Sequence, residues 1–316
     1  MLPIDKIIGK IYPLFAFSLL FMAGALMVML FVKMPQLPEL WTHFYNMGAE
    51  AEPEKWTDQI FPCLFITIAC GAISGFHATQ SPLMARCVKS EHMGRPIFYG
   101  AMITEGVVAL IWATVSSWFF YGSPAPGYEL IAAVNTGFST SAPAVVNIVC
   151  NDWLGVAGAI LALLGVVAAP ITSGDTAFRS ARLIIGEWLH IDQRPIIKRL
   201  AICLPLFISS IAMLVWQIEN PDGFNIIWQY FGWANQTLSV FTLWTLTVYL
   251  VRQKKPYIIT LIPALLMTTV CTTFLFVSKQ AFHLPENIGY LLGILCLVVA
   301  LVWFIVWYRK EKSKLV

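Results

Sequence analysis

The sequence predicts an all-α integral membrane protein, with about eight transmembrane helices in a single transmembrane domain over residues 1–316. Hydrophobic residues make up 58% of the chain and charged residues 12%, with a mean hydropathy of +0.73. Water-soluble domains carry about 25% charged residues, so no soluble fold could cover this much apolar surface. Apolar stretches of about 20 residues, long enough to cross a bilayer, recur along the chain.

The basic residues indicate the orientation of the spans, because cytoplasmic loops retain Lys and Arg. Eight spans with a cytoplasmic N-terminus leave only Lys33, Lys55 and Lys279 of the 20 Lys and Arg residues outside. Both termini are therefore expected in the cytoplasm, with a short tail at 309–316. The expected spans are 11–32, 60–80, 97–120, 153–172, 199–219, 225–250, 256–277 and 288–308.

A ninth apolar stretch, 128–149, is not counted as a span. Counting it would reverse every later segment and scramble the charge bias. Pro124, Pro126 and Pro143 interrupt the longer segment 121–152, and a polar NTGFSTS turn lies in its middle. We expect 121–152 to form an external re-entrant hairpin, with an ordinary long loop as the alternative.

The segment GAISGFHATQSPLMARC, residues 71–87, predicts a broken helix. Its apolar lead-in, 60–73, would rise only about 21 Å as an α-helix and cannot cross the membrane alone. Interrupted backbone at membrane depth is tolerated where it lines a polar cavity, and transporters place substrate and ion sites there. The alternative is a cytoplasmic loop beginning at Ser74. His77 could accept a proton or simply pack through hydrogen bonds.

The segment APITSGDTAFRSARL, residues 169–183, predicts a second interruption, at Pro170 and Gly174. Its oxygen-bearing side chains suit Na⁺, or a proton on the carboxylate. The candidate ion-coupling residues here are Thr172, Ser173, Asp175 and Thr176. The alternative is a helix end where Asp175 pairs with Arg179 four residues later.

Two further polar features lie inside apolar segments. Asn235 and Gln236 either bridge helices by hydrogen bonds or line the substrate pathway. Glu105 is the only charged residue within its span and is either a proton carrier or a buried partner of a basic group.

Several protein classes are not indicated. The seven cysteines are scattered, with no metal-ligand spacing. No nucleophile elbow, HExxH motif or Walker loop occurs, so the sequence predicts neither an enzyme nor an ATP-driven pump. No cofactor is expected beyond a possible bound Na⁺. The sequence contains no basic stripe with interleaved aromatic residues, so nucleic-acid binding is not expected.

Three motifs together resemble the carbon starvation protein A family of bacterial inner-membrane transporters: ACGAISGFHATQSPLMARC, APITSGDTAFRSARLI and WQYFGWANQTL. The resemblance implies uptake of peptides, or of pyruvate in some members. It also implies a fold related to the amino-acid/polyamine/organocation (APC) superfamily, with two inverted five-helix repeats. The segment 60–86 would then begin the second repeat, the ITSGD span would be its third helix, and 121–152 would be an external gating loop.

The family's members carry a preceding transmembrane half with a glycine-rich broken helix. The resemblance therefore implies that this chain corresponds to the C-terminal half of such a transporter, surrounded by membrane lipid, with a separate N-terminal half as a possible partner.

The sequence thus predicts a secondary transporter of peptides or pyruvate, coupled to H⁺ or Na⁺. A passive channel, or a fragment that does not transport alone, is the alternative. The predicted substrate-binding residues are Ser74, Gly75, His77, Thr79, Gln80, Ser81, Asn235 and Gln236. The predicted ion-coupling residues are Thr172, Ser173, Asp175, Thr176 and Glu105.

Overall fold

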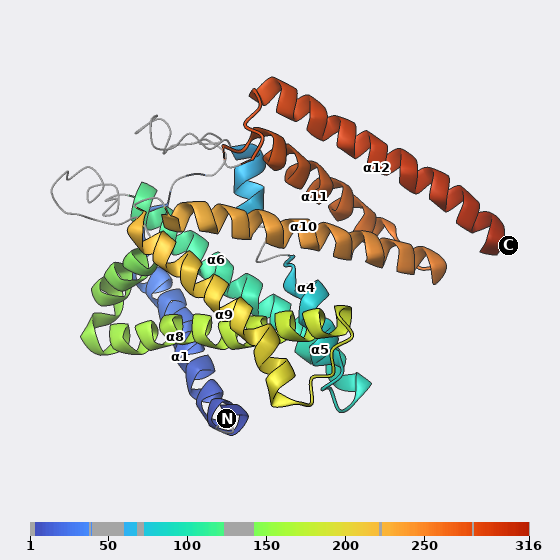
Figure 1. Cartoon of the computed structure of the whole chain (residues 1–316). Coiled ribbons are helices and arrows are strands. Elements are labelled where there is room, and N and C mark those ends of the chain that lie inside the picture. Colours follow the sequence, from blue (N-terminus) through green and yellow to red (C-terminus); the bar gives the residue numbers. More distant parts are fainter. Residues whose placement is uncertain are drawn as a thin grey trace. The chain divides into compact units, whose positions relative to one another are not determined.

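A computed structural model describes residues 4–37, 39, 60–67, 73–122, 142–220, 223–279 and 281–315 of the 316-residue chain. Its regular elements in these ranges are all helical (Figure 1). The chain forms two compact units: unit 1 contains Met1–Phe44 and Gly100–Leu183, and unit 2 contains Tyr45–Tyr99 and Ile184–Val316.

Unit 1 is built from α1 (Ile4–Lys33), α6 (Gly100–Tyr121) and most of α8 (Ala142–Trp188). Its core joins side chains of all three helices, including Leu26, Val115, Phe119, Cys150 and Trp153. The helices pack through apolar side chains and through close contact of small residues, as membrane helices do.

Helix α8 bends at Gly155, where φ is +66° and ψ is 179°. This left-handed φ is a conformation that favours glycine. The prediction of an interruption at Pro170 and Gly174 is wrong, because α8 continues as a helix through both residues to Trp188. A proline inside a membrane helix removes one amide donor without ending the helix when its neighbours compensate.

Unit 2 contains α9 (Ile196–Glu219), α10 (Gly223–Arg252), α11 (Ile258–Val277) and α12 (Glu286–Leu315). Helix α11 lies between α10 and α12 (Figure 1). A Cβ atom added at Gly289 or Gly293 of α12 would collide with Val277 or Thr273 of α11. The two glycines, at 289 and 293, therefore form a small-residue repeat that lets these two helices approach closely.

The remaining elements of unit 2 are short. They are the π-helix η1 (Ile60–Leu64), the helices α4 (Phe76–Thr79) and α5 (Ser81–Ala85), the 3₁₀ turn η2 (Glu91–Met93) and the π-helix η3 (Arg95–Tyr99). Ile73 and Ser74 are not helical, so the predicted interruption of the segment 60–86 is observed.

Five helices within the described residues are long and apolar enough to cross a membrane: Tyr12–Lys33, Glu91–Tyr121, Ile196–Glu219, Ile258–Val277 and Glu286–Ser313. The other three predicted spans correspond to the interrupted segment, to α8 and to α10. The expected total of eight, like the cytoplasmic termini, stays a prediction.

The predicted external hairpin, 121–152, falls mostly outside the described residues, which leave out 123–141. Its last part, from Ala142 to Asp152, forms the first arm of α8 before the bend at Gly155. Asp152 in this arm accepts a hydrogen bond from Lys33 at the end of α1, at 3.2 Å.

Substitution of Gly165 by alanine is expected to destabilise unit 1. Its Cβ would lie 2.8 Å from the backbone nitrogen of Leu19 and 3.0 Å from the carbonyl carbon of Ser18, and backbone cannot rotate away. We expect a loss of about 1–3 kcal/mol in the free energy of unfolding. Gly174→Ala, on the same helix with open space around it, is the control. Thermal unfolding in detergent measures both, and equal midpoints would contradict the packing.

Candidate functional site

The backbone groups of Ser74 and Gly75, at the interruption, have hydrogen-bonding partners. The amide of Ser74 lies 3.0 Å from Nδ1 of His77, and the carbonyl of Ser74 accepts the amide of His77 at 3.1 Å. The carbonyl of Gly75 accepts the amide of Ala78 at 3.0 Å. Non-helical backbone is costly in a membrane unless its polar groups have partners, and these contacts provide them.

Asn235 of α10 attaches to this interruption. Its Oδ1 accepts hydrogen bonds from the amide of Gly75 at 2.8 Å and from Oγ of Ser74 at 3.1 Å. One amide oxygen thus satisfies a backbone donor and a side-chain donor of a segment 160 residues away. Two of the three sequence motifs are in direct contact.

Gly75 is required here for its size. A Cβ atom at this position would lie 2.8 Å from Oδ1 and 3.0 Å from the carbonyl oxygen of Asn235. Its φ of −58° is accessible to any residue, so backbone conformation alone does not require a glycine at this position. The missing side chain allows α10 to reach the backbone.

Helix α10 also contacts the lead-in side of the interruption. Gln236, which is fully buried, donates from Nε2 to the carbonyl of Ile66 at 3.4 Å, and Ser239 donates to the carbonyl of Gln236 at 2.7 Å. A Cβ at Gly232 would lie 3.1 Å from Cγ2 of Ile66. Positions 232, 235 and 236 therefore hold both sides of the interruption on one helix face.

The other predicted substrate-binding residues follow the interruption. His77 and Thr79 lie on α4, Gln80 joins the two short helices, and Ser81 begins α5; all four are partly buried. Nδ1 of His77 also lies 2.7 Å from the carbonyl of Ser74, so the tautomer decides whether it donates or accepts. Contact of these residues with a substrate stays a prediction.

Asn235 and Gln236 have interhelical partners, which is the first of the two roles that their sequence context allows. Hydrogen bonds of this kind between membrane helices contribute about 1 kcal/mol. Direct contact of either amide with substrate stays a prediction.

The predicted ion-coupling residues lie in unit 1. Oδ2 of Asp175 accepts from Nη2 of Arg179 at 2.9 Å and from the hydroxyl of Tyr12 at 3.4 Å. The i,i+4 ion pair of the alternative interpretation is therefore present. Ser173 is exposed and Thr176 is partly buried on the same helix, while the side chain of Thr172 lies outside the described set.

Glu105 lies on α6 with an exposed side chain. An exposed carboxylate within an apolar helix is expected to meet protein, water or a membrane surface rather than hydrocarbon. Its role as a proton carrier stays a prediction.

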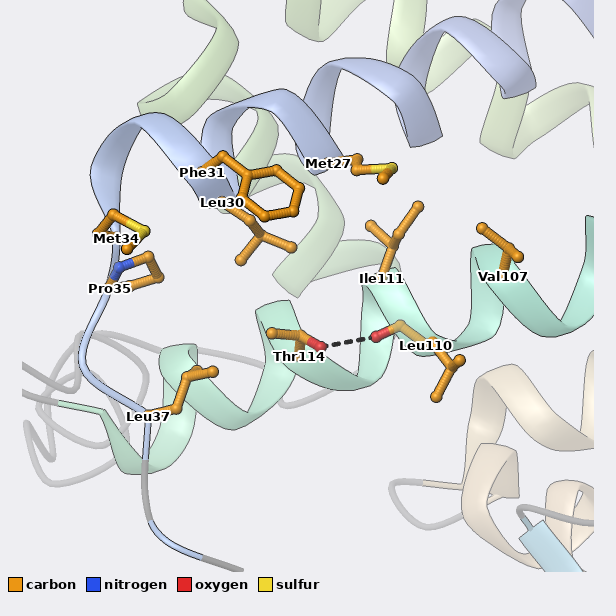
Figure 2. A pocket seen from close by; sticks show the side chains of 10 residues that line it. All are labelled: Met27, Leu30, Phe31, Met34, Pro35, Leu37, Val107, Leu110, Ile111 and Thr114. Carbon is orange, nitrogen blue, oxygen red and sulfur yellow. Dashed lines mark hydrogen bonds between the residues drawn. The ribbon is translucent and has the colours of Figure 1, made fainter.

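A large groove in unit 1 lacks the chemistry of a polar-substrate site. It encloses about 520 Å³ between α1 and α6, and Figure 2 shows side chains such as Leu30, Phe31 and Ile111 facing it. The hydroxyl of Thr114 donates to the carbonyl of Leu110 at 2.8 Å. The remaining lining residues are apolar, which suits a lipid chain or another helix.

The sequence reasoning missed Tyr290 of α12. Its hydroxyl donates to the carbonyl of Phe61 at 3.1 Å, which attaches the lead-in helix η1 to α12. Tyr290 directly follows Gly289, one of the two small residues of α12 that pack against α11, and this position could have indicated an interhelical contact.

Apolar helical spans with an interrupted segment held by a neighbouring helix, as the described residues form them, are typical of polytopic membrane transporters. The family comparison is more specific. The model of the carbon starvation protein CstA family matches residues 1–124 and 125–274, and the chain belongs to this family.

Curated relatives agree with this assignment. A protein of Bacillus subtilis named peptide transporter CstA is 28% identical over 328 residues, covering 92% of this chain and 54% of the relative. The Escherichia coli peptide transporter CstA is 26% identical, covering 75% of this chain and 42% of the relative. The chain thus spans about half the length of these relatives.

Two further matches cover shorter segments. An uncharacterized membrane protein of Haemophilus influenzae is 46% identical over 144 residues, covering 42% of this chain and 38% of the relative. The E. coli pyruvate/proton symporter BtsT is 41% identical over 75 residues, covering 23% of this chain and 10% of the symporter. No solved structure matches the chain.

Replacing Asn235 by alanine is expected to loosen the interruption, because the donors of Ser74 and Gly75 lose their acceptor. Leaving buried donors unpaired costs about 1–3 kcal/mol. Thermal unfolding measures the effect. Asn147→Ala, an exposed asparagine on α8, is the control and should change the midpoint little.

A double-mutant cycle separates the contact from general packing. If Ser74 and Asn235 interact directly, the costs of Ser74→Ala and Asn235→Ala will add to more than the cost of the double variant. Strict additivity would contradict the hydrogen bond between them.

Proposed function

We propose that this chain takes part in secondary active transport, importing short peptides across the bacterial inner membrane with H⁺ or Na⁺ as the coupling ion. The observation that carries the proposal is the interrupted segment, with the amide of Gly75 and the hydroxyl of Ser74 held by Asn235 of α10. Discontinuous helices of this kind form substrate sites in secondary transporters.

The names of the relatives support peptides as the substrate class. Two relatives that match over 92% and 75% of this chain are named peptide transporters. Pyruvate is the second candidate, supported by the 75-residue match to a pyruvate/proton symporter. Peptides and pyruvate both carry a carboxylate, which a site rich in hydroxyl, amide and imidazole donors can bind.

The proposed mechanism uses the short helices α4 and α5 as the moving part. Ser74, Gly75, His77, Thr79, Gln80 and Ser81 would contact the substrate, with Asn235 and Gln236 anchoring the segment. Because Asn235 and Gln236 of α10 hold the interruption, a shift of that helix would move the site with it. The APC-type inverted-repeat arrangement is part of this proposal.

The coupling ion is proposed to bind at Asp175 with Ser173 and Thr176, or to be a proton carried by Asp175 or Glu105. A cation would compete with Arg179 for the carboxylate. The ion pair joins side chains with 46% and 33% exposure, so exchanging its partner costs little.

Two alternatives to this proposal make different predictions. A passive channel would conduct without saturation and without a gradient. A chain that requires a separate N-terminal half would transport only together with that half, as the span of about half of the relatives' length allows.

Uptake by intact bacteria tests the proposal. Cells that produce the chain from its own genomic region should accumulate labelled dialanine in a saturable manner, and dissipating the proton or sodium gradient should abolish accumulation. Labelled pyruvate in parallel distinguishes the substrates. Saturable but gradient-independent flux would remove the coupling, and the absence of both fluxes would contradict the proposal.

Replacing Asp175 by asparagine separates coupling from structure. If Asp175 binds the coupling ion, Asp175→Asn abolishes gradient-driven accumulation and leaves the thermal midpoint nearly unchanged, since exposed ion pairs contribute about 0–1 kcal/mol. Asp192→Asn, in the exposed turn after α8, is the matched control. Normal gradient dependence in Asp175→Asn would leave Asp175 as a partner of Arg179 only.

A further inference from the structure

A polar pocket of about 330 Å³ lies in unit 2, at the turn that joins α11 to α12. The turn connects two helices that are each able to cross a membrane, Ile258–Val277 and Glu286–Ser313, so it must lie at a membrane surface. The distribution of basic residues predicts the outer surface for Lys279. The volume falls in the range of small-ligand sites, about 300–1,000 Å³.

The pocket carries groups of both charge types. Lys279 and His283 supply cationic or hydrogen-bond-donating nitrogens, Glu286 supplies a carboxylate, and Gln229 and Ser278 add an amide and a hydroxyl. Phe274, Val277 and Leu284 form apolar wall between them. A ligand that fits this set has an anionic end, a cationic end and a small apolar body.

The turn is held in place by its own hydrogen bonds. The amide of His283 donates to the carbonyl of Ser278 at 3.2 Å, and the amide of Leu284 donates to the carbonyl of Phe276 at 2.8 Å. His283 has a φ of +49°, in the left-handed region where residues other than glycine are uncommon.

The pocket adjoins the lead-in of the interrupted segment. Cys63 of η1 contributes to the lining of the pocket. Tyr290, one helical turn after Glu286 on α12, donates to the carbonyl of Phe61, which also belongs to η1. A ligand bound here would therefore touch an element that precedes Ser74 and Gly75 in the interrupted segment.

We propose that this pocket is an outer loading site for short zwitterionic peptides, with the peptide carboxylate at Lys279 and His283 and the peptide ammonium at Glu286. The inference rests on the proposed function, because it names the substrate form and its first point of contact. Charge-assisted hydrogen bonds at both ends of the ligand would select peptides with free termini.

Binding measurements on the purified full chain in lipid nanodiscs test the inference. Labelled dialanine should bind saturably, and N-acetyl-dialanine and dialanine amide should compete about tenfold less well, as expected for the loss of one charge-assisted contact. Equal competition by the blocked peptides, or no dialanine binding at millimolar concentration, would overturn the proposal.

Three variants assign the ends. Glu286→Gln should weaken dialanine binding without weakening N-acetyl-dialanine binding. Lys279→Gln and His283→Asn should weaken dialanine binding without weakening the binding of dialanine amide. Asparagine tolerates the left-handed φ, so His283→Asn removes the imidazole while the backbone is kept. A folding defect would weaken all ligands together.

The chain offers matched controls. His190 also has a left-handed φ, +54°, in an exposed turn after α8, and Lys255 is exposed in the turn between α10 and α11. His190→Asn and Lys255→Gln should leave all three affinities unchanged. Equal effects at control and pocket positions would overturn the proposal.

Dialanine uptake by cells distinguishes this inference from the proposed function. Normal uptake with unaltered kinetics in the pocket variants would overturn the loading site and leave the transporter intact. Variant-sensitive binding without any uptake would leave the site intact and overturn the transport proposal.

Discussion

The contact between Asn235 and the Ser74–Gly75 interruption is the constraint on which unit 2 depends. An interrupted helix exposes amides and carbonyls that hydrocarbon cannot satisfy, and each unsatisfied group would cost several kcal/mol. Here the amide of Gly75 and the hydroxyl of Ser74 donate to Asn235 of α10, and the amide of Ser74 lies 3.0 Å from Nδ1 of His77. The result is a non-helical stretch that is compatible with membrane depth.

The rest of unit 2 positions α10 for this contact. Trp233 Nε1 donates to the carbonyl of Cys271 at 3.1 Å, and Trp244 Nε1 donates to Thr268 Oγ1 at 3.1 Å, so two tryptophans fix α10 to α11. The small-residue face of α12 then packs on the other side of α11. Three packed helices thereby hold one short interruption and, at the α11–α12 turn, the polar pocket.

Much of this arrangement could be predicted from the sequence, for physical reasons. The lead-in before Ser74 is too short to cross a bilayer, so an interruption had to follow, and amides such as Asn235 at membrane depth had to find partners. The pairing of Asn235 with Gly75 could not be predicted, because 160 residues separate them and no local pattern encodes the contact. The prediction at Pro170 was wrong because a membrane helix can continue through a proline when the missing amide donor is compensated. The observed bend is at Gly155, where the neighbouring residues contain no comparable sequence signal.

The contact with α10 should hold the interruption in one ordered conformation. Hydrogen–deuterium exchange of the intact protein in nanodiscs measures this order, because the amide of Gly75 donates to Asn235. We expect exchange at Gly75 to be as slow as in the interior of α10, and slower still when dialanine is added. Exchange at Gly75 as fast as in an unstructured peptide, with no response to dialanine, would contradict this hydrogen bond.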